Sequence, residues 1–210
     1  MLIDRIFKWT IFRASKPLCK DRKEPKLDFF ETLEDVNVEV FDCSVENYDS
    51  EKGTFMTLKD YLLFWRSEKN KKDGKILYLK NWHFDKDFPD IKLYSNPEYF
   101  TSDWLNEYLE VQNKDFKQLF LGPKNSWTHF HYDIFCSHAW AANIAGFKKW
   151  IIVQPEFEFK DVLDISEVLP VDTGNDVLEP FDCKIYNDIR YFEVIQGPGD
   201  FLFIPSGLFQ

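Results

Sequence analysis

The second half of the chain consists of short stretches in which apolar and polar residues alternate. Turn residues separate several of them, at Gly122-Pro123, Gly146 and Gly197-Pro198-Gly199. A period of two places successive side chains on opposite faces and predicts β-strands, and several such strands at short spacing predict a barrel or jelly roll. The predicted strands are 118–121, 128–134, 139–145, 148–153, 191–195 and 200–204, with an acidic, irregular insertion between Val153 and Asp188.

The first half shows helical periodicity alongside two further strands. Apolar residues after Thr57 recur at i, i+3, i+4 and i+7, which predicts a helix with Thr57 as its N-cap. Another helix is predicted with Ser102 as its N-cap, again with apolar residues on one side. The remaining predictions here are a short helix at 27–33 and strands at 36–43 and 76–79.

Length and composition favour one folded, acidic domain. The chain has 210 residues, of which 44% are hydrophobic and 18% aromatic, a composition typical of a globular β-rich protein. Its net charge of −10 repels a phosphate backbone, so we do not expect a nucleic-acid partner, whereas a basic protein substrate is compatible. We expect a loosely structured lead-in at 1–26 and one α+β domain at 27–210, with a helical flank at 27–116 and a β core at 117–210.

Cysteine usage and hydropathy bear on the compartment. The four cysteines, Cys19, Cys43, Cys136 and Cys183, match neither a zinc-binding pattern nor a compact disulfide framework. Free thiols in a reducing compartment are expected, which points to the cytoplasm, with the nucleus as a second location. No apolar run approaches the roughly 20 residues of a membrane span, and Asp4 argues against a mitochondrial presequence.

The predicted strand at 128–134 carries a candidate metal-binding pair. His131 and Asp133 are two residues apart, so on a strand they point to the same face and offer one imidazole and one carboxylate to a single ion. Two such ligands with a distant second histidine form the facial triad of non-haem iron(II) oxygenases. On its own the triplet is also explained by a solvated strand face.

Three other features of the sequence favour a metal-binding role for His131 and Asp133. Thr128 precedes His131 by three residues, where a hydroxyl could reach a bound acid. Lys148 follows a glycine turn, and inside a barrel its ammonium would need an anion such as a dicarboxylate cosubstrate; the alternative is an exposed member of a Lys-Lys pair. The segment from Gly199 has the form glycine, five residues, Pro-x-Gly, and then Gln210 at the position of the distant histidine.

The other histidines are weaker candidates. His129 and Asp133 lie about 13 Å apart along an extended strand, so one ion cannot take both without a bend. His138 could swing towards the site, and His83 is most simply structural. The sequence has no nucleophile-elbow motif to support a Ser/His/Asp hydrolase, and it has no glycine-rich phosphate-binding loop.

Together these residues resemble the JmjC family of iron(II)- and 2-oxoglutarate-dependent oxygenases. The resemblance covers residues 26 to 209. It rests on Phe130-His131-Tyr132-Asp133-Ile134-Phe135 and Gly146-Phe147-Lys148-Lys149-Trp150, and also on the segments 41–44, 57–61, 77–83, 99–107 and 122–127.

The resemblance implies a double-stranded β-helix (cupin-like) core and a set of site residues. His131 and Asp133 would be the iron ligands, and Lys148 would bind the distal carboxylate of 2-oxoglutarate, assisted by Thr128 and with Asn143 facing the cosubstrate. It also implies lysyl hydroxylation of a protein with molecular oxygen. The eukaryotic peptide-chain release factor would be the substrate, and the enzyme would support translation termination.

Two departures from the family pattern leave three hypotheses open. Gln210 stands where the family has its distal histidine, and the chain is shorter than the family pattern at both ends. An amide oxygen is a poorer iron ligand than imidazole, so we expect the chain as given to be a poor or inactive oxygenase. The hypotheses are an oxygenase of this family, a non-catalytic binding module that keeps the fold, and a JmjC enzyme acting on histones or another protein.

Overall fold

The computed structural model describes residues 11–13, 27–44, 53–67, 74–94, 96–112, 114–153, 181–186 and 189–210. The described part is mainly β with a few helices, as predicted. It forms two compact units, one from Lys26–Thr128 and one from Met1–Pro25 with His129–Gln210. No helix among the described residues is both long and apolar enough to cross a bilayer.

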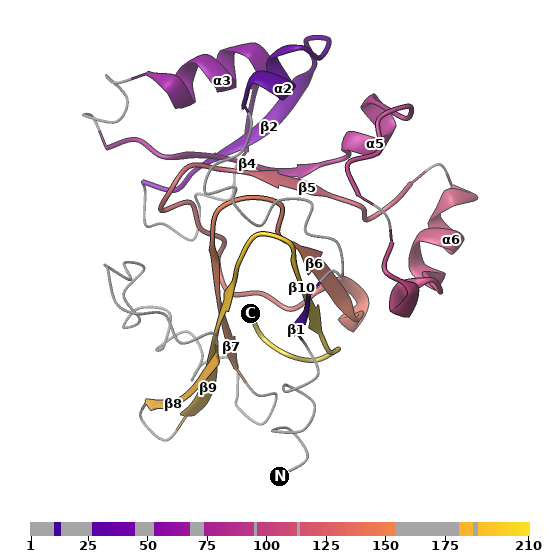
Figure 1. Ribbon diagram of the computed structural model, residues 1–210, viewed down its shortest axis with the longest axis vertical. Helices are drawn as coiled ribbons and strands as arrows, with labels where there is room; N and C mark the ends of the chain where they lie inside the picture. The colour runs from indigo at the N-terminus through magenta and orange to yellow at the C-terminus, as the bar shows by residue number, and fades with distance from the viewer. Residues whose placement is uncertain are drawn as a thin grey trace. The chain divides into compact units, whose positions relative to one another are not determined.

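The unit at 26–128 contains a four-stranded antiparallel sheet in the order β3-β2-β4-β5. Its strands are β2 (Asn37–Asp42), β3 (Thr54–Thr57), β4 (Leu77–Trp82) and β5 (Leu119–Leu121). The helices of this unit are α2 (Leu27–Glu31), α3 (Leu58–Arg66), α5 (Phe84–Asp87) and α6 (Trp104–Glu110), with a 3₁₀ turn η2 (Glu98–Phe100). The segment predicted as a helical flank therefore also contributes three strands to a sheet (Figure 1).

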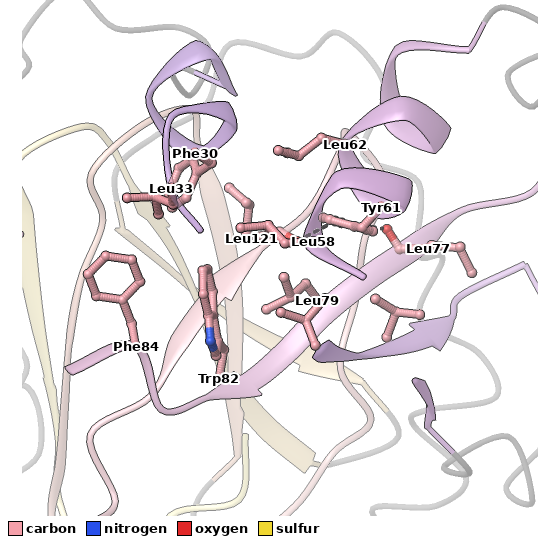
Figure 2. Close-up of a cluster of buried hydrophobic side chains, with 12 residues drawn as sticks. Phe30, Leu33, Leu58, Tyr61, Leu62, Leu77, Leu79, Trp82, Phe84 and Leu121 are labelled. Carbon is pink, nitrogen blue, oxygen red and sulfur yellow. Dashed lines mark hydrogen bonds between the residues drawn. The ribbon is translucent and has the colours of Figure 1, made fainter. Parts of the chain in front are cut away.

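The core of this unit lies between the sheet and the helices α2 and α3. Figure 2 shows aromatic and aliphatic side chains of the two helical segments directed at β4 and β5. Tyr61 of α3 is fully buried, and its hydroxyl donates a hydrogen bond to the carbonyl of Leu121 at 2.5 Å. Asn81 has a φ of 59° at a register shift in β4, so that Leu79 and Trp82 both reach this core.

Helix capping agrees with one prediction and corrects another. The side chain of Thr57 accepts a hydrogen bond from the backbone N–H of Asp60 at 3.1 Å, which confirms it as the N-cap of α3. For α6 the cap is Asp103, which accepts from the N–H of Asn106 at 3.2 Å, so the prediction of Ser102 was wrong by one residue.

The second unit contains two three-stranded antiparallel sheets, β1-β10-β6 and β7-β9-β8. Their bounds are β1 (Ile11–Arg13), β6 (Ala139–Ala142), β7 (Lys148–Val153), β8 (Phe181–Tyr186), β9 (Ile189–Gln196) and β10 (Asp200–Ile204). The chain switches between the sheets at the turn from β6 to β7 and again at the turn from β9 to β10 (Figure 1). Both sheets contribute to one apolar cluster, made of Ile152, Phe192, Val194, Leu202 and Ile204.

Three predictions for this unit need correction. Residues 128–134 are not a strand; they are irregular as far as Asp133 and continue into a 3₁₀ turn, η3 (Ile134–Cys136). Strand β8 lies inside the segment that we expected to be irregular. Strand β1 lies inside the expected loose lead-in, where it pairs with β10; the rest of 1–26 is outside the described residues.

Candidate functional site

The segment that carries His131 is paired with the last residues of the sequence. His131 N–H donates to the carbonyl of Gln210 at 2.7 Å, and Gln210 N–H donates back to the carbonyl of His131 at 3.0 Å. Phe209 forms a similar reciprocal pair with Val153 at the end of β7. Backbone hydrogen bonds on two sides therefore place Gln210 next to His131.

Aromatic packing fixes which way this segment faces. The ring of Phe209 is only 1% exposed; it stacks on Phe130 at 5.3 Å and contacts Tyr132 at 4.7 Å between ring centroids. Because side chains alternate along extended backbone, Phe130 and Tyr132 on one face leave His131 and Asp133 on the other.

The predicted metal-binding pair is brought together at one point. Nε2 of His131 lies 4.0 Å from Oδ1 of Asp133. Nδ1 of His131 lies 2.9 Å from the carbonyl oxygen of His129. A carbonyl can only accept, so Nδ1 carries a proton and donates, which leaves Nε2 as the ring nitrogen on the side of the carboxylate. A backbone acceptor of this kind commonly orients a histidine ligand in metal sites.

Gln210 completes this group of side chains. Its Nε2 donates a hydrogen bond to Oδ2 of Asp133 at 3.0 Å. Its Oε1 is buried and has no hydrogen-bond partner among the described residues. Burial raises the pKa of Asp133, while the charge of His131, the hydrogen bond from Gln210 and the charge of Lys148 act in the opposite direction.

Lys148 begins β7, on the same strand face as Trp150 and Ile152. Its Nζ lies 3.7 Å from the centre of the Trp150 ring, a cation–π contact. Burial lowers the pKa of Lys148 to about 8, and the negative charge of Asp133 opposes that shift. A partly buried ammonium in this setting is suited to binding an anion.

Gln196 was not predicted from the sequence, although it joins four strands. It is 1% exposed, and its Oε1 accepts a hydrogen bond from the indole N–H of Trp150 at 2.9 Å. Its Nε2 donates to the carbonyls of Ala141 at 2.8 Å and Asp200 at 2.9 Å. The signal in the sequence was its parity with the apolar residues of β9, which puts its side chain on the inner face.

The two other predicted cosubstrate residues are Asn143 and Thr128. The side-chain amide of Asn143 donates to the carbonyls of Gly146 at 2.8 Å and Gln196 at 3.0 Å, so it holds the turn between β6 and β7. Thr128 is exposed and is the last residue of the other unit.

The remaining histidines make contacts of their own. Nδ1 of His138 accepts a hydrogen bond from the backbone N–H of Ser206 at 3.0 Å, so its Nε2 carries a proton and cannot serve as a ligand atom. His83 bonds through Nδ1 to Asp115 at 2.6 Å, in keeping with a structural role. Among the cysteines whose side chains are described, Cys43 and Cys136 are free thiols.

The donor set decides whether a metal could be held here. Within the described residues, no group of three His, Cys, Asp or Glu side chains is arranged to bind an ion. The group at this site instead offers one imidazole nitrogen, one carboxylate and one amide whose oxygen lacks a partner. Nitrogen and oxygen donors of this kind fit a divalent first-row metal ion.

Comparison with known proteins identifies the family of this chain. The model of a family described as "Cupin-like domain" matches residues 5–210. The chain is 38% identical over 196 residues to "2-oxoglutarate and iron-dependent oxygenase JMJD4" of Gallus gallus, covering 87% of this chain and 45% of the relative. It is 32% identical over 226 residues to the Drosophila melanogaster JMJD4 homolog, covering 96% and 52%.

A plant protein is also similar. "Arginine-specific demethylase JMJ20" of Arabidopsis thaliana is 29% identical over 221 residues, covering 93% of this chain and 46% of the relative. The chain thus spans about half the length of these curated relatives. The family match confirms the cupin-like jelly-roll fold predicted from the sequence: this protein belongs to the cupin-like domain family.

Proposed function

We propose that this protein is an iron(II)- and 2-oxoglutarate-dependent oxygenase that acts on a protein side chain. The observation that carries the proposal is the convergence of His131, Asp133 and Gln210, with Nε2 of the imidazole 4.0 Å from the carboxylate and the Gln210 amide hydrogen-bonded to it. The names of the JMJD4 relatives, which state iron and 2-oxoglutarate dependence, support the proposal.

The residues of the chain would have distinct tasks. His131 and Asp133 would hold the ion, and the ammonium of Lys148 would bind the distal carboxylate of 2-oxoglutarate through a charge-assisted hydrogen bond. When bound, the ion and 2-oxoglutarate would supply the oxidising chemistry: one atom of molecular oxygen enters a C–H bond, the other enters succinate, and the cosubstrate loses carbon dioxide. The cation–π contact with Trp150 would hold the ammonium in place.

For the substrate, we propose a lysine side chain of a protein, and the eukaryotic peptide-chain release factor as that protein. The support is the JmjC resemblance of the motifs around His131 and Lys148. The net charge of −10 is compatible with a substrate segment rich in lysine, because opposite charges favour encounter.

A second candidate substrate is a methylated arginine, because the Arabidopsis relative is named an arginine-specific demethylase. Hydroxylation of an N-methyl carbon gives a product that releases formaldehyde and leaves the nitrogen demethylated. The same site residues would serve both reactions, so the products separate the two candidates.

The test uses the purified chain with iron(II), ascorbate, 2-oxoglutarate and air, and two peptides. One peptide comes from the release factor and contains lysine; the other contains methylarginine. We expect a mass gain equal to one oxygen atom on lysine in the first peptide. Formaldehyde from the second peptide alone would favour demethylation. If neither product forms with the wild-type chain or with Gln210→His, the non-catalytic binding module becomes the better hypothesis.

A further inference from the structure

Resting on the proposed function, we propose that Gln210 is the third protein ligand of the metal, through Oε1. We further infer that this oxygen shifts the metal preference of the site towards Mn(II), relative to a site with imidazole at this position. Carbonyl and carboxylate oxygens suit manganese and magnesium, whereas imidazole suits iron, cobalt, nickel and zinc.

The first argument is position. Gln210 pairs with His131 through two backbone hydrogen bonds, and its neighbour Phe209 is locked against Val153 in the same way. The Gln210 side chain already contacts Asp133, one of the two predicted ligands. A side chain held this close to both ligands needs no rearrangement of the backbone to reach an ion between them.

The second argument is the unsatisfied oxygen. Buried amide oxygens nearly always have a hydrogen-bond donor, yet Oε1 of Gln210 has none among the described residues. The N–H₂ end of the same amide faces the carboxylate of Asp133. A cation next to that carboxylate reverses this preference, because it repels the N–H₂ end and attracts the oxygen.

Rotation of the Gln210 amide towards the ion also explains why an amide would bind the metal more weakly than imidazole. When the oxygen turns to the ion, the N–H₂ group gives up its hydrogen bond to Asp133. Part of the gain from the metal–oxygen bond therefore offsets that loss. An imidazole at 210 would face no such trade.

A purely structural Gln210 predicts something different. In that case its only task is to hold Asp133 through the 3.0 Å hydrogen bond. Replacement by leucine, which offers no donor atom, would then change the affinity for all divalent ions by the same factor, because the ligand set stays His131 and Asp133. The ratio of two metal affinities is therefore the readout that separates a ligand from an orienting residue.

The experiment measures metal binding alone, without turnover. Mn(II) is titrated by electron paramagnetic resonance and Co(II) by visible absorption, in wild type, Gln210→His, Gln210→Glu and Gln210→Leu. Gln112→Leu makes the same chemical change at an exposed position of the other unit and serves as the control. Circular dichroism shows which variants fold; if Gln210→Leu does not, Gln210→Met takes its place, because its soft thioether suits neither ion.

We expect Gln210→Leu to weaken Mn(II) binding by about 10- to 100-fold, the range seen when groups around a bound metal are altered, and Co(II) binding by less, so that the affinity ratio falls. Gln210→His should strengthen Co(II) more than Mn(II), changing their affinity ratio by about tenfold, while Gln210→Glu should strengthen Mn(II) more than Co(II). An unchanged ratio of the two affinities in Gln210→Leu would overturn the assignment of Gln210 as a ligand, because histidine or glutamate at 210 could bind the ion whether or not the wild-type amide does.

The outcomes also separate this inference from the proposed function. If neither wild type nor Gln210→His binds either ion, the metal site itself is wrong and both proposals fall. If the ratio shifts as expected but no peptide is oxidised, Gln210 is a ligand and the oxygenase proposal fails alone. If peptide oxidation is observed and the ratio is unchanged, only the role of Gln210 is lost.

Discussion

The indole N–H of Trp150 donates a hydrogen bond to Oε1 of Gln196 at 2.9 Å, while the ring of the same tryptophan lies 3.7 Å from the ammonium of Lys148. Gln196 is itself tied to β6 and β10 through the carbonyls of Ala141 and Asp200. A buried polar residue of the core thus holds the aromatic ring that contacts the candidate cosubstrate lysine.

Replacing Gln196 should be costly for folding. Gln196→Leu would leave the indole N–H of Trp150 without its partner and remove one hydrogen bond from each of two backbone carbonyls, with an expected loss of about 2–4 kcal/mol in the free energy of unfolding. The measurement is urea denaturation followed by circular dichroism. Gln118→Leu, at an exposed position, is the control and should stay within about 0.5 kcal/mol of wild type. A loss at Gln196 no larger than at Gln118 would show that the network contributes little.

Trp150 should affect cosubstrate binding through its ring. A cation–π contact of this kind is worth roughly 0.5–1 kcal/mol or more, so Trp150→Leu should weaken 2-oxoglutarate binding by about two- to tenfold. Trp150→Phe keeps a ring and should lose less. Calorimetry of 2-oxoglutarate binding measures both, and a larger loss with phenylalanine than with leucine would contradict the role given to the ring.

Lys148 should dominate the binding of 2-oxoglutarate. A charge-assisted hydrogen bond in a partly dry site is worth about 1.5–3 kcal/mol, so Lys148→Ala should weaken binding by about 10- to 100-fold. The matched control is Lys149→Ala, because Lys149 lies on the opposite strand face and pairs with Glu193 at 2.7 Å. Thr128→Ala should have a smaller effect than Lys148→Ala. Equal affinity of wild type and Lys148→Ala would remove Lys148 from the site.

The pH dependence of that binding follows from the lowered pKa of Lys148. Burial brings this pKa to about 8, so the side chain is an ammonium below that pH and a neutral amine above it. The affinity for 2-oxoglutarate should therefore be steady up to neutral pH and fall as the pH rises through 8 and beyond. A bound dicarboxylate moves the fall to higher pH, because it favours the charged form. The Lys148→Ala variant should show no such fall, and one of equal size there would point to another group.

The hydroxyl of Tyr61 should stabilise the core between the sheet and the helices α2 and α3. Tyr61→Phe removes the hydroxyl that bonds the buried carbonyl of Leu121, and should lower the free energy of unfolding by about 1–2 kcal/mol. Tyr108→Phe makes the same change at a side chain that is 66% exposed and should be nearly neutral. Thermal unfolding of the two variants side by side is the measurement, and similar melting temperatures would contradict the expectation.

The sequence predicted which residues meet at the site better than it predicted the backbone that carries them. Parity alone put His131 and Asp133 on one face, and they lie together as that argument requires. The predicted strand failed because the segment pairs with only a short terminal stretch and then turns through Phe135 and Cys136, which have positive φ values of 55° and 48°. Neither feature has a local signature, since neither residue is glycine.

Long-range partners explain the other misses. Strand β1 was not predicted because its pairing depends on β10, about 190 residues away in the sequence. Asn143 stays a prediction as a cosubstrate residue, but the hydrogen bonds of its amide to two carbonyls, one of them from β9, could not be predicted from the sequence. The buried position of Gln196 could be read from the alternation along β9, whereas its partners on β6 and β10 could not, because those contacts exist only after the two sheets pack.

The central claim is that His131 and Asp133 hold the metal of a 2-oxoglutarate oxygenase, with Gln210 as a weaker third group. The most direct measurement is iron(II)-dependent conversion of 2-oxoglutarate to succinate by wild type, Asp133→Ala and Gln210→His. We predict slow turnover by wild type, none by Asp133→Ala, and faster turnover by Gln210→His, because imidazole is the better iron ligand. Equal turnover by wild type and Asp133→Ala, or no iron-dependent turnover even with histidine at 210, would contradict the account.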